Sequence, residues 1–149
     1  MRDRMARVDL AIEEIRPQVA ALPYRHAPDL EILLVTSRET GRWVIPKGKL
    51  MKGLTLWEAA AQEALEEAGV VGVIGETPLG TYDYVKFLKS GVGAACRVTV
   101  FPLAVREQLP TWLEQHQRES RWFAWAEAVE AVHETGLGAI VEAFARERS

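Results

Sequence analysis

The 149-residue sequence contains a single cysteine, Cys96, so no disulfide can form within the chain. It has no run of about 20 apolar residues that would span a membrane, and no hydrophobic signal core near its N-terminus. A net charge of −3 provides no general basic field, which argues against non-specific binding to nucleic acid or to an anionic membrane. We therefore expect a cytoplasmic protein that acts on a small molecule, with its oligomeric state left open.

Lysine and arginine are absent from Gly53 to Val85, although this stretch contains a strongly acidic predicted helix. Thr55 followed by Glu58 has the spacing of a capping box, and Gly69 is suited to end the helix. The side of the helix predicted to pack against the rest of the protein carries Leu54, Trp57, Ala61, Ala64, Leu65 and Ala68.

Three carboxylates, those of Glu63, Glu66 and Glu67, fall within an arc of about 100° on the other side of this helix. Like charges at these spacings destabilise an isolated helix by roughly 0.2–0.5 kcal/mol per pair. Because the neighbouring sequence has no basic partner for them, the pattern predicts a bound divalent cation such as Mg²⁺ or Mn²⁺, which prefers oxygen ligands.

The remaining pattern predicts an α/β/α sandwich with a mixed sheet, because helices alternate with strands of which some are linked as hairpins. The acidic helix is expected on one face and the C-terminal helix on the other. A loop is expected from Lys47 to Gly53. The predicted strands are 19–24, 30–36, 42–45, 79–88, 95–105 and 121–125, and the other helices are 126–133 and 137–146.

The segment from Gly48 to Val70 resembles the Nudix box, G-x5-E-x7-R-E-U-x-E-E-x-G-U with U aliphatic. The residues in register are Gly48, Glu63, Ala64, Glu66, Glu67, Gly69 and Val70. The resemblance implies a single Nudix domain over residues 17–149, preceded by a lead-in over residues 1–16. It also implies metal-dependent hydrolysis of a diphosphate linked to another group.

The same resemblance implies roles for individual residues of the box. Glu63, Glu66 and Glu67 become the metal ligands, the Gly48 carbonyl adds a backbone ligand, and Glu66 or Glu67 positions the attacking water. Two positions depart from the pattern, since Leu54 replaces a Glu and Gln62 replaces an Arg. In the family these two side chains commonly form an ion pair, so their joint loss leaves no uncompensated charge.

The sequence upstream of the box resembles one branch of the family. Thr36, Ser37 and Arg38 stand where the diphosphoinositol polyphosphate phosphohydrolases have a Ser-rich segment ending in Arg, whereas Pro46-Lys47-Gly48 is closer to the diadenosine polyphosphate hydrolases. Both substrate classes therefore stay open. A housecleaning nucleoside triphosphate pyrophosphatase and a non-catalytic nucleotide-binding domain are the alternatives.

Basic residues gather just before the acidic helix, at Arg38, Arg42, Lys47, Lys49 and Lys52. A cationic loop beside a metal-loaded acidic face suits a polyphosphate, whose oxygens can bridge the two. The predicted substrate-binding residues are Ser37, Arg38, Lys47 and Lys49.

By the same resemblance the general base lies either on the acidic helix or in a later loop, and the polar segment from Arg106 to Ser120 stands in the right place in the chain for that loop. Glu119 is the first candidate and Glu114 the second, against the alternative that both are simply solvated loop acids. Four aromatic residues are candidates to stack on an adenine, although aromatic side chains at strand spacing more often belong to the core: Tyr82, Tyr84, Phe87 and Trp112.

Overall fold

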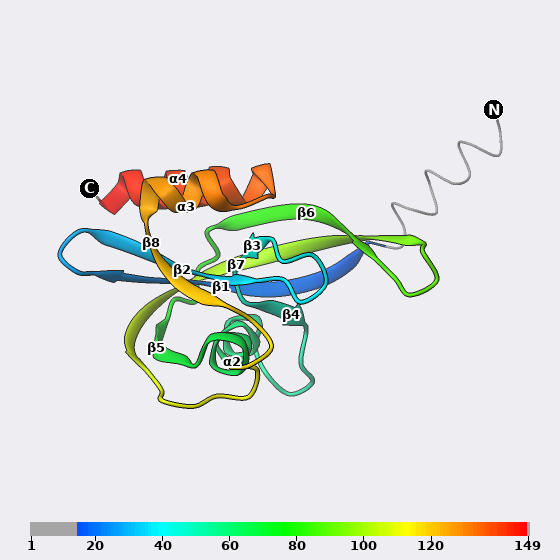
Figure 1. Ribbon diagram of the computed structural model, residues 1–149, viewed down its shortest axis with the longest axis horizontal. Coiled ribbons are helices and arrows are strands. Elements are labelled where there is room, and N and C mark those ends of the chain that lie inside the picture. The colour runs from blue at the N-terminus through cyan, green and yellow to red at the C-terminus, as the bar shows by residue number, and fades with distance from the viewer. Residues whose placement is uncertain (1–14, 149) are drawn as a thin grey trace.

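The computed structural model describes residues 15–148, in which a mixed sheet has helices on both faces (Figure 1). Helix α2 covers one face, and α3 with α4 covers the other, so the predicted α/β/α sandwich is confirmed. Residues 1–14 of the predicted lead-in lie outside the described residues, and Arg16 already begins the first strand. The elements are β1 (Arg16–His26), β2 (Leu30–Thr36), β3 (Trp43–Val44), β4 (Lys47–Lys49), α2 (Leu56–Ala68), β5 (Val70–Ile74), β6 (Gly80–Phe87), β7 (Gly93–Gln108), β8 (Ser120–Ala124), α3 (Trp125–Ala131) and α4 (Thr135–Arg148).

Strands β1 and β7 run parallel in the middle of the sheet, in a register that places Val19 beside Thr99. Strands β2 and β4 pair antiparallel with β1, while β5 and β6 pair antiparallel with successive parts of the long β7. Strands β3 and β8 extend the sheet from β2. No helix within residues 15–148 is long and apolar enough to cross a membrane.

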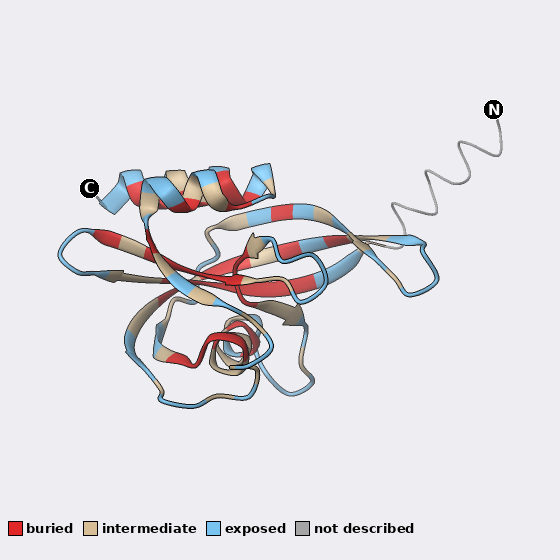
Figure 2. Cartoon of the chain, viewed as in Figure 1, coloured by how far each residue is buried: buried red, intermediate tan, exposed pale blue. Residues whose placement is uncertain are grey.

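Buried side chains form one cluster on each face of the sheet, and β2 contributes to both. Leu33 and Val35 belong to the cluster under α2, whereas Ile32 and Leu34 belong to the cluster under α4, which includes Leu137. Successive side chains of a strand point to opposite faces, so a continuous apolar run suits a strand covered on both sides. Figure 2 shows this burial along the central strands and on the sheet-facing sides of the helices.

Two short strands occupy segments that the sequence pattern does not predict as strands. The expected loop from Lys47 to Gly53 begins with β4, which pairs with residues 18–20 of β1. Strand β5 follows α2 directly and pairs with the end of β7. Strand β4 reads KGK and has low β-propensity, so its pairing is decided by the sheet edge that β1 offers, whereas β5 reads VVGVI and is rich in β-branched residues that favour a strand.

Helix α2 begins and ends as predicted and buries part of the predicted side, at Ala64 and Ala68. Thr55 forms the capping box with Glu58, and Gly69 ends the helix in the left-handed conformation. The predicted packing side is wrong at Leu54, which is 43% exposed, because it precedes the N-cap and does not follow the helical period. The buried residues of the helix are Ala59, Ala60, Ala64, Glu67 and Ala68.

Replacing Thr55 by alanine removes one half of the capping box. The Glu58 amide donates to Thr55 Oγ1 at 3.2 Å, and the Thr55 amide donates to Glu58 Oε1 at 2.8 Å. We expect Thr55→Ala to lower the free energy of unfolding by about 1 kcal/mol in urea denaturation. Thr55→Ser keeps the accepting hydroxyl and should lose less than half as much; equal losses would contradict the role of the cap.

Candidate functional site

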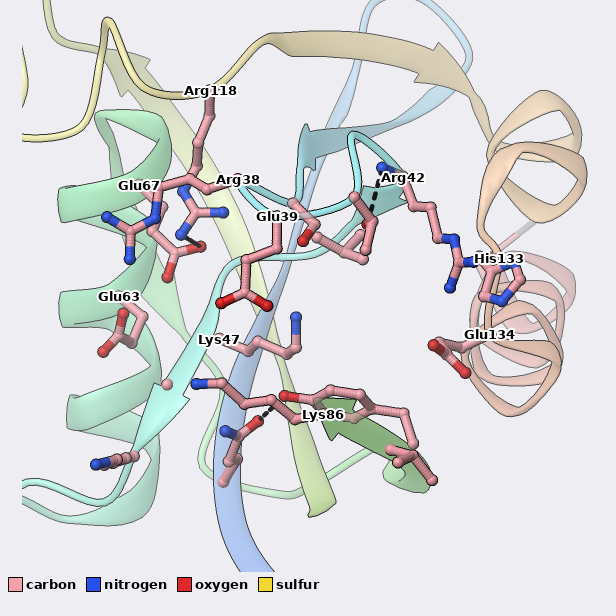
Figure 3. A pocket seen from close by; sticks show the side chains of 18 of the residues that line it. Arg38, Glu39, Arg42, Lys47, Glu63, Glu67, Lys86, Arg118, His133 and Glu134 are labelled. Atoms are coloured by element: carbon pink, nitrogen blue, oxygen red, sulfur yellow. Dashed lines mark hydrogen bonds and ion pairs between the residues drawn. The ribbon is translucent and has the colours of Figure 1, made fainter. Parts of the chain in front are cut away.

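A cavity of about 580 Å³ opens between α2 and the junction of α3 with α4. Figure 3 shows Glu63 and Glu67 of α2 on one side of it and His133 and Glu134 on the opposite side. Lys47 of β4 lies between these walls. The cavity therefore has an acidic wall, a basic middle and a second wall that carries another carboxylate.

Glu63 and Glu67 lie one helical turn apart, and their carboxyl groups are hydrogen-bonded to each other. Burial raises the pKa of Glu67, Arg118 and Lys47 lower it, and the hydrogen bond with Glu63 raises it further. Burial also raises the pKa of Glu63. Two carboxyl groups in one buried place retain a shared proton unless a cation takes its place.

The backbone of Gly48 lies directly against this acidic pair. Gly48 is the middle residue of β4 and pairs with Val19 of β1. A Cβ atom built on Gly48 would collide with the carboxyl group of Glu63, so a larger residue there would push that carboxyl group aside. Glu63 and Glu67 therefore place two carboxyl groups beside the backbone of β4, and carboxylate oxygens are ligands that Mg²⁺ prefers.

Glu66, the third predicted ligand, does not join this group in the structure. Its carboxylate accepts a hydrogen bond from Gln62 Nε2 at 2.8 Å, although the residue still lines the cavity. Within residues 15–148, no three acidic, histidine or cysteine side chains are arranged to hold one ion together. That hydrogen bond uses Glu66 Oε2 and leaves Oε1 for another partner.

Arg118 is the counter-ion that the sequence around the helix lacks, and sequence reasoning missed it. Its guanidinium donates to Glu114 Oε1 at 2.8 Å and to the Thr36 carbonyl at 3.0 Å, and it lies 3.8 Å from Glu67 Oε1. Its side chain is only 11% exposed. Arg118 lies in a loop far along the chain from Glu67, so no local spacing connects the two.

The loop that carries Arg118 is held against the end of α2. The Leu109 amide donates to the Gly69 carbonyl at 2.7 Å, and the Glu114 amide donates to the Glu66 carbonyl at 2.9 Å. The last carbonyls of a helix lack partners within it, so the loop satisfies them. The Trp112 ring packs where a side chain at Gly69 would lie, which makes a larger residue at that position doubly unfavourable.

The two predicted general bases have different surroundings. Glu119 is exposed, does not line the cavity, and pairs through its backbone with Thr36. Glu114 lines the cavity, with its carboxylate bound by Arg118. A catalytic role for Glu119 stays a prediction that its placement does not favour, and Glu114 is the better placed of the two.

The predicted phosphate-binding residues all line the cavity: Ser37, Arg38, Lys47 and Lys49. Lys47 lies deepest among them, so burial lowers the pKa of its ammonium group, while the nearby Glu67 opposes that shift. Arg38 is exposed at the entrance and donates to Gln117 Oε1 at 2.8 Å. The structure thus brings this predicted set together beside the acidic pair.

The aromatic candidates separate into two groups. Tyr82, Tyr84 and Phe87 of β6 line the cavity, with Phe87 68% exposed. Trp112 does not line it, because its ring packs on Gly69. Lys86 also lines the cavity, and its alternation with Tyr82 and Tyr84 along one strand is a signal that was available in the sequence.

The sequence profile of the NUDIX domain matches residues 15–144. The chain belongs to the Nudix family. It is 37% identical over 123 residues to Nudix hydrolase 13, mitochondrial, of Arabidopsis thaliana, covering 78% of this chain and 60% of that protein. It is 32% identical over 123 residues to diphosphoinositol polyphosphate phosphohydrolase 3-alpha of Mus musculus, covering 80% of this chain and 71% of that protein.

The chain spans about 60% of the length of the first of these two relatives. Its fold is similar to the crystal structure of a C. elegans Ap4A hydrolase, with a TM-score of 0.65 and 20% sequence identity over 91% of this chain and 99% of that one. The NUDIX domain of Shewanella oneidensis NrtR, solved with ADP ribose, has a TM-score of 0.58 at 19% identity over 90% of this chain and 88% of that one. These structures show that the Nudix fold is shared.

The two departures from the Nudix box leave no unpaired charge. Leu54 is exposed, and the Gln62 amide is used by Glu66. Nudix enzymes generally use divalent metal ions, and the residues present fit such an ion, because Gly48 leaves the space and two adjacent carboxyl groups supply the oxygens. Glu63, Glu67 and the Gly48 backbone would hold it.

Gly48→Ala tests the contact between strand β4 and the acidic pair. The new methyl group should displace the Glu63 carboxyl group, and we expect the affinity for Mg²⁺, measured by calorimetric titration, to fall about tenfold or more. Gly138→Ala on α4 is the matched control, because a Cβ atom there meets only ordinary contacts. Equal Mg²⁺ affinity in both variants would contradict the proposed contact.

The raised pKa values of Glu63 and Glu67 predict a pH-dependent stabilisation by Mg²⁺. Metal binding must displace the shared proton, so it competes with protonation below the raised pKa and strengthens above it. Without metal, ionisation of the pair at rising pH destabilises the folded state. We expect the increase in Tm on adding Mg²⁺ to grow from about pH 6 to about pH 9. An increase that is constant or shrinks with pH would contradict the shared proton.

Proposed function

We propose that this chain is a metal-dependent Nudix phosphohydrolase that cleaves a phosphoanhydride bond in a small-molecule polyphosphate. The observation that carries the proposal is the juxtaposition of the Glu63–Glu67 pair with the basic side chains of Arg38 and Lys47 in one cavity. Its membership of the Nudix family supports the same reaction class. The proposed substrates are diphosphoinositol polyphosphates, diadenosine polyphosphates or both.

The acidic wall is the proposed metal site, with Mg²⁺ or Mn²⁺ held by Glu63, Glu67 and the Gly48 backbone, and by Glu66 through the oxygen that Gln62 does not use. A bound divalent cation supplies charge neutralisation at the phosphate oxygens and lowers the pKa of a bound water. Glu67 is also the carboxylate best enclosed by protein. Its buried position beside Arg118 and Lys47 lets it accept a proton without leaving the site.

The basic middle of the cavity is the proposed polyphosphate site. Figure 3 shows the Lys47 side chain extending into the middle of the cavity, and Glu67 is near enough to act on its pKa, so a phosphate bound by this ammonium group would lie close to the proposed metal ligands. Arg38 and Ser37 hold a further phosphate at the entrance. Because these groups come from rigid strand ends and a short turn, they orient the substrate before reaction.

Hydrolysis of a substrate panel tests the proposal. Diphosphoinositol pentakisphosphate, diadenosine tetraphosphate and a nucleoside triphosphate are each incubated with Mg²⁺ and either the wild-type chain, Glu67→Gln, or the exposed α3 variant Glu130→Gln as matched control. We expect turnover that needs Mg²⁺ and falls about 100-fold or more in Glu67→Gln only. Undiminished activity in Glu67→Gln would refute the assigned site.

The products of the same panel separate the alternatives. Release of terminal phosphate from the inositol substrate, or of two nucleotides from the diadenosine substrate, supports the proposed reaction. Pyrophosphate released mainly from the triphosphate indicates a housecleaning pyrophosphatase instead. Tight binding with no turnover of any substrate at saturating Mg²⁺ indicates a non-catalytic domain, for which the changes at Leu54 and Gln62 are the sequence support.

A further inference from the structure

Large apolar side chains are exposed on two segments of the surface. Among residues 15–148, eight such side chains are strongly exposed, and six of them belong to the β4–α2 loop, to the start of α2 or to the β6–β7 hairpin: Leu50, Leu54, Leu56, Val85, Phe87 and Val92. Phe87 is 68% exposed and Val92 is 61% exposed. Val85 and Phe87 both contact the place that a side chain at Gly93 would fill, so they share one side of the hairpin. Scattered apolar residues on a surface need no explanation, whereas a group of them indicates an interaction site.

Sheet pairing brings these two segments to the end of the sheet where β1 begins. Strand β4 ends at Lys49, opposite Gln18 of β1, and β6 passes the start of β1 with Tyr84 in the same row as Arg16. Neighbouring strands lie about 4.8 Å apart, so β4 and β6, with β1 and β7 between them, are separated by roughly 15 Å. Figure 1 shows the β6–β7 hairpin projecting from this end of the sheet.

Both segments are basic, although the chain as a whole has a net charge of −3. Residues 40–57 and 84–106 contain no Asp or Glu. Each segment carries two lysines among its apolar residues, namely Lys49 and Lys52 in the loop and Lys86 and Lys89 in the hairpin. Within the part of the chain that the structure describes, none of these four lysines forms a salt bridge. The overall charge therefore hides a positive surface at this end of the sheet.

The acidic residues that border these segments in the sequence do not neutralise the lysines. Asp83 is bound by Arg97, whose Nε donates to Asp83 Oδ1 at 2.9 Å. Glu58 forms the capping box of α2, Glu39 lines the cavity, and Glu107 lies at the other end of β7 beside β5. The four lysines therefore keep their charge available to an anionic partner.

The chemistry of this surface distinguishes among three partners. Nucleic acids are bound by aromatic stacking as well as by charge, whereas five of the six exposed side chains are aliphatic. A second copy of the chain seated symmetrically on the same surface would place lysines opposite lysines, which is unfavourable. A membrane with anionic lipids accepts both features, because apolar side chains enter below the headgroups while lysine ammonium groups stay among the phosphates.

We propose that the β4–α2 loop and the β6–β7 hairpin form a docking surface for an anionic phospholipid membrane. The proposal goes beyond the proposed hydrolysis and does not depend on it. Each lysine held near an anionic surface strengthens attachment about fivefold, so four lysines and a few inserted side chains give reversible binding that weakens with added salt. Because Lys49 and Lys86 also line the cavity, the mouth of the cavity lies beside the attached membrane.

Co-sedimentation of the full chain with lipid vesicles tests the proposal. Vesicles of phosphatidylcholine alone are compared with vesicles of equal parts phosphatidylcholine and phosphatidylserine. We expect the partition coefficient to be at least about tenfold higher with phosphatidylserine and to fall as salt is added. Lys89→Glu should lower it about tenfold and Val92→Ser about threefold, and neither residue lines the cavity.

Arg106→Glu and Leu113→Ser are the matched controls for charge and for apolar area. Arg106 is exposed near the other end of β7, and Leu113 is 73% exposed in the loop held against the end of α2. Absence of binding to phosphatidylserine vesicles, or equal losses in the controls, would overturn the proposal. So would a dimer, seen by sedimentation velocity, that Val92→Ser dissociates, or binding to single-stranded RNA that is tighter than binding to vesicles. These measurements contain no substrate, so their outcome is independent of the hydrolysis panel.

Discussion

The buried carboxyl group of Glu67 is the constraint on which the arrangement of the site depends. A buried charge is strongly unfavourable unless it is paired or neutralised. Three groups reduce the free-energy cost of burying this carboxyl group: the proton shared with Glu63, the guanidinium of Arg118 at 3.8 Å, and the ammonium group of Lys47. They belong to α2, to the loop after β7 and to β4, so the site exists only when the sheet brings these three segments together.

The same constraint explains why the site suits a divalent cation. Lys47 has a lowered pKa because it is buried, and Glu67 has a raised pKa for the same reason. The acidic wall therefore has carboxyl oxygens whose negative charge is only partly balanced by the neighbouring cationic side chains. The shared proton is no longer needed once a divalent cation is bound, and the collision that any Cβ atom at Gly48 would cause shows how closely the backbone approaches these oxygens.

Local features of the site were predictable from the sequence because they depend on short spacings. Thr55 and Glu58 are three residues apart, and Glu63 and Glu67 are one turn apart on the same helix. Arg118 and Glu134 were not predictable, because loop docking and helix packing decide their positions. Glu66 shows a third case, since its place in the box is evident but its side chain bonds to Gln62. The spacing of residues along a helix shows which side chains can meet, but it does not show which of the possible hydrogen bonds forms.

Arg118 also connects the acidic wall to the turn that carries Ser37 and Arg38, the proposed phosphate-binding residues. Its guanidinium bonds to the Thr36 carbonyl, and the Thr36 amide and hydroxyl bond in turn to the backbone of Glu119. Ser37 and Arg38 follow Thr36 directly, so the turn proposed to bind the phosphates is attached to the group that faces Glu67. One hydrogen-bond network thus sets the separation between the metal-side oxygens and the phosphate-side cations. Such preorganisation is what stabilises developing charge in a transition state without further rearrangement.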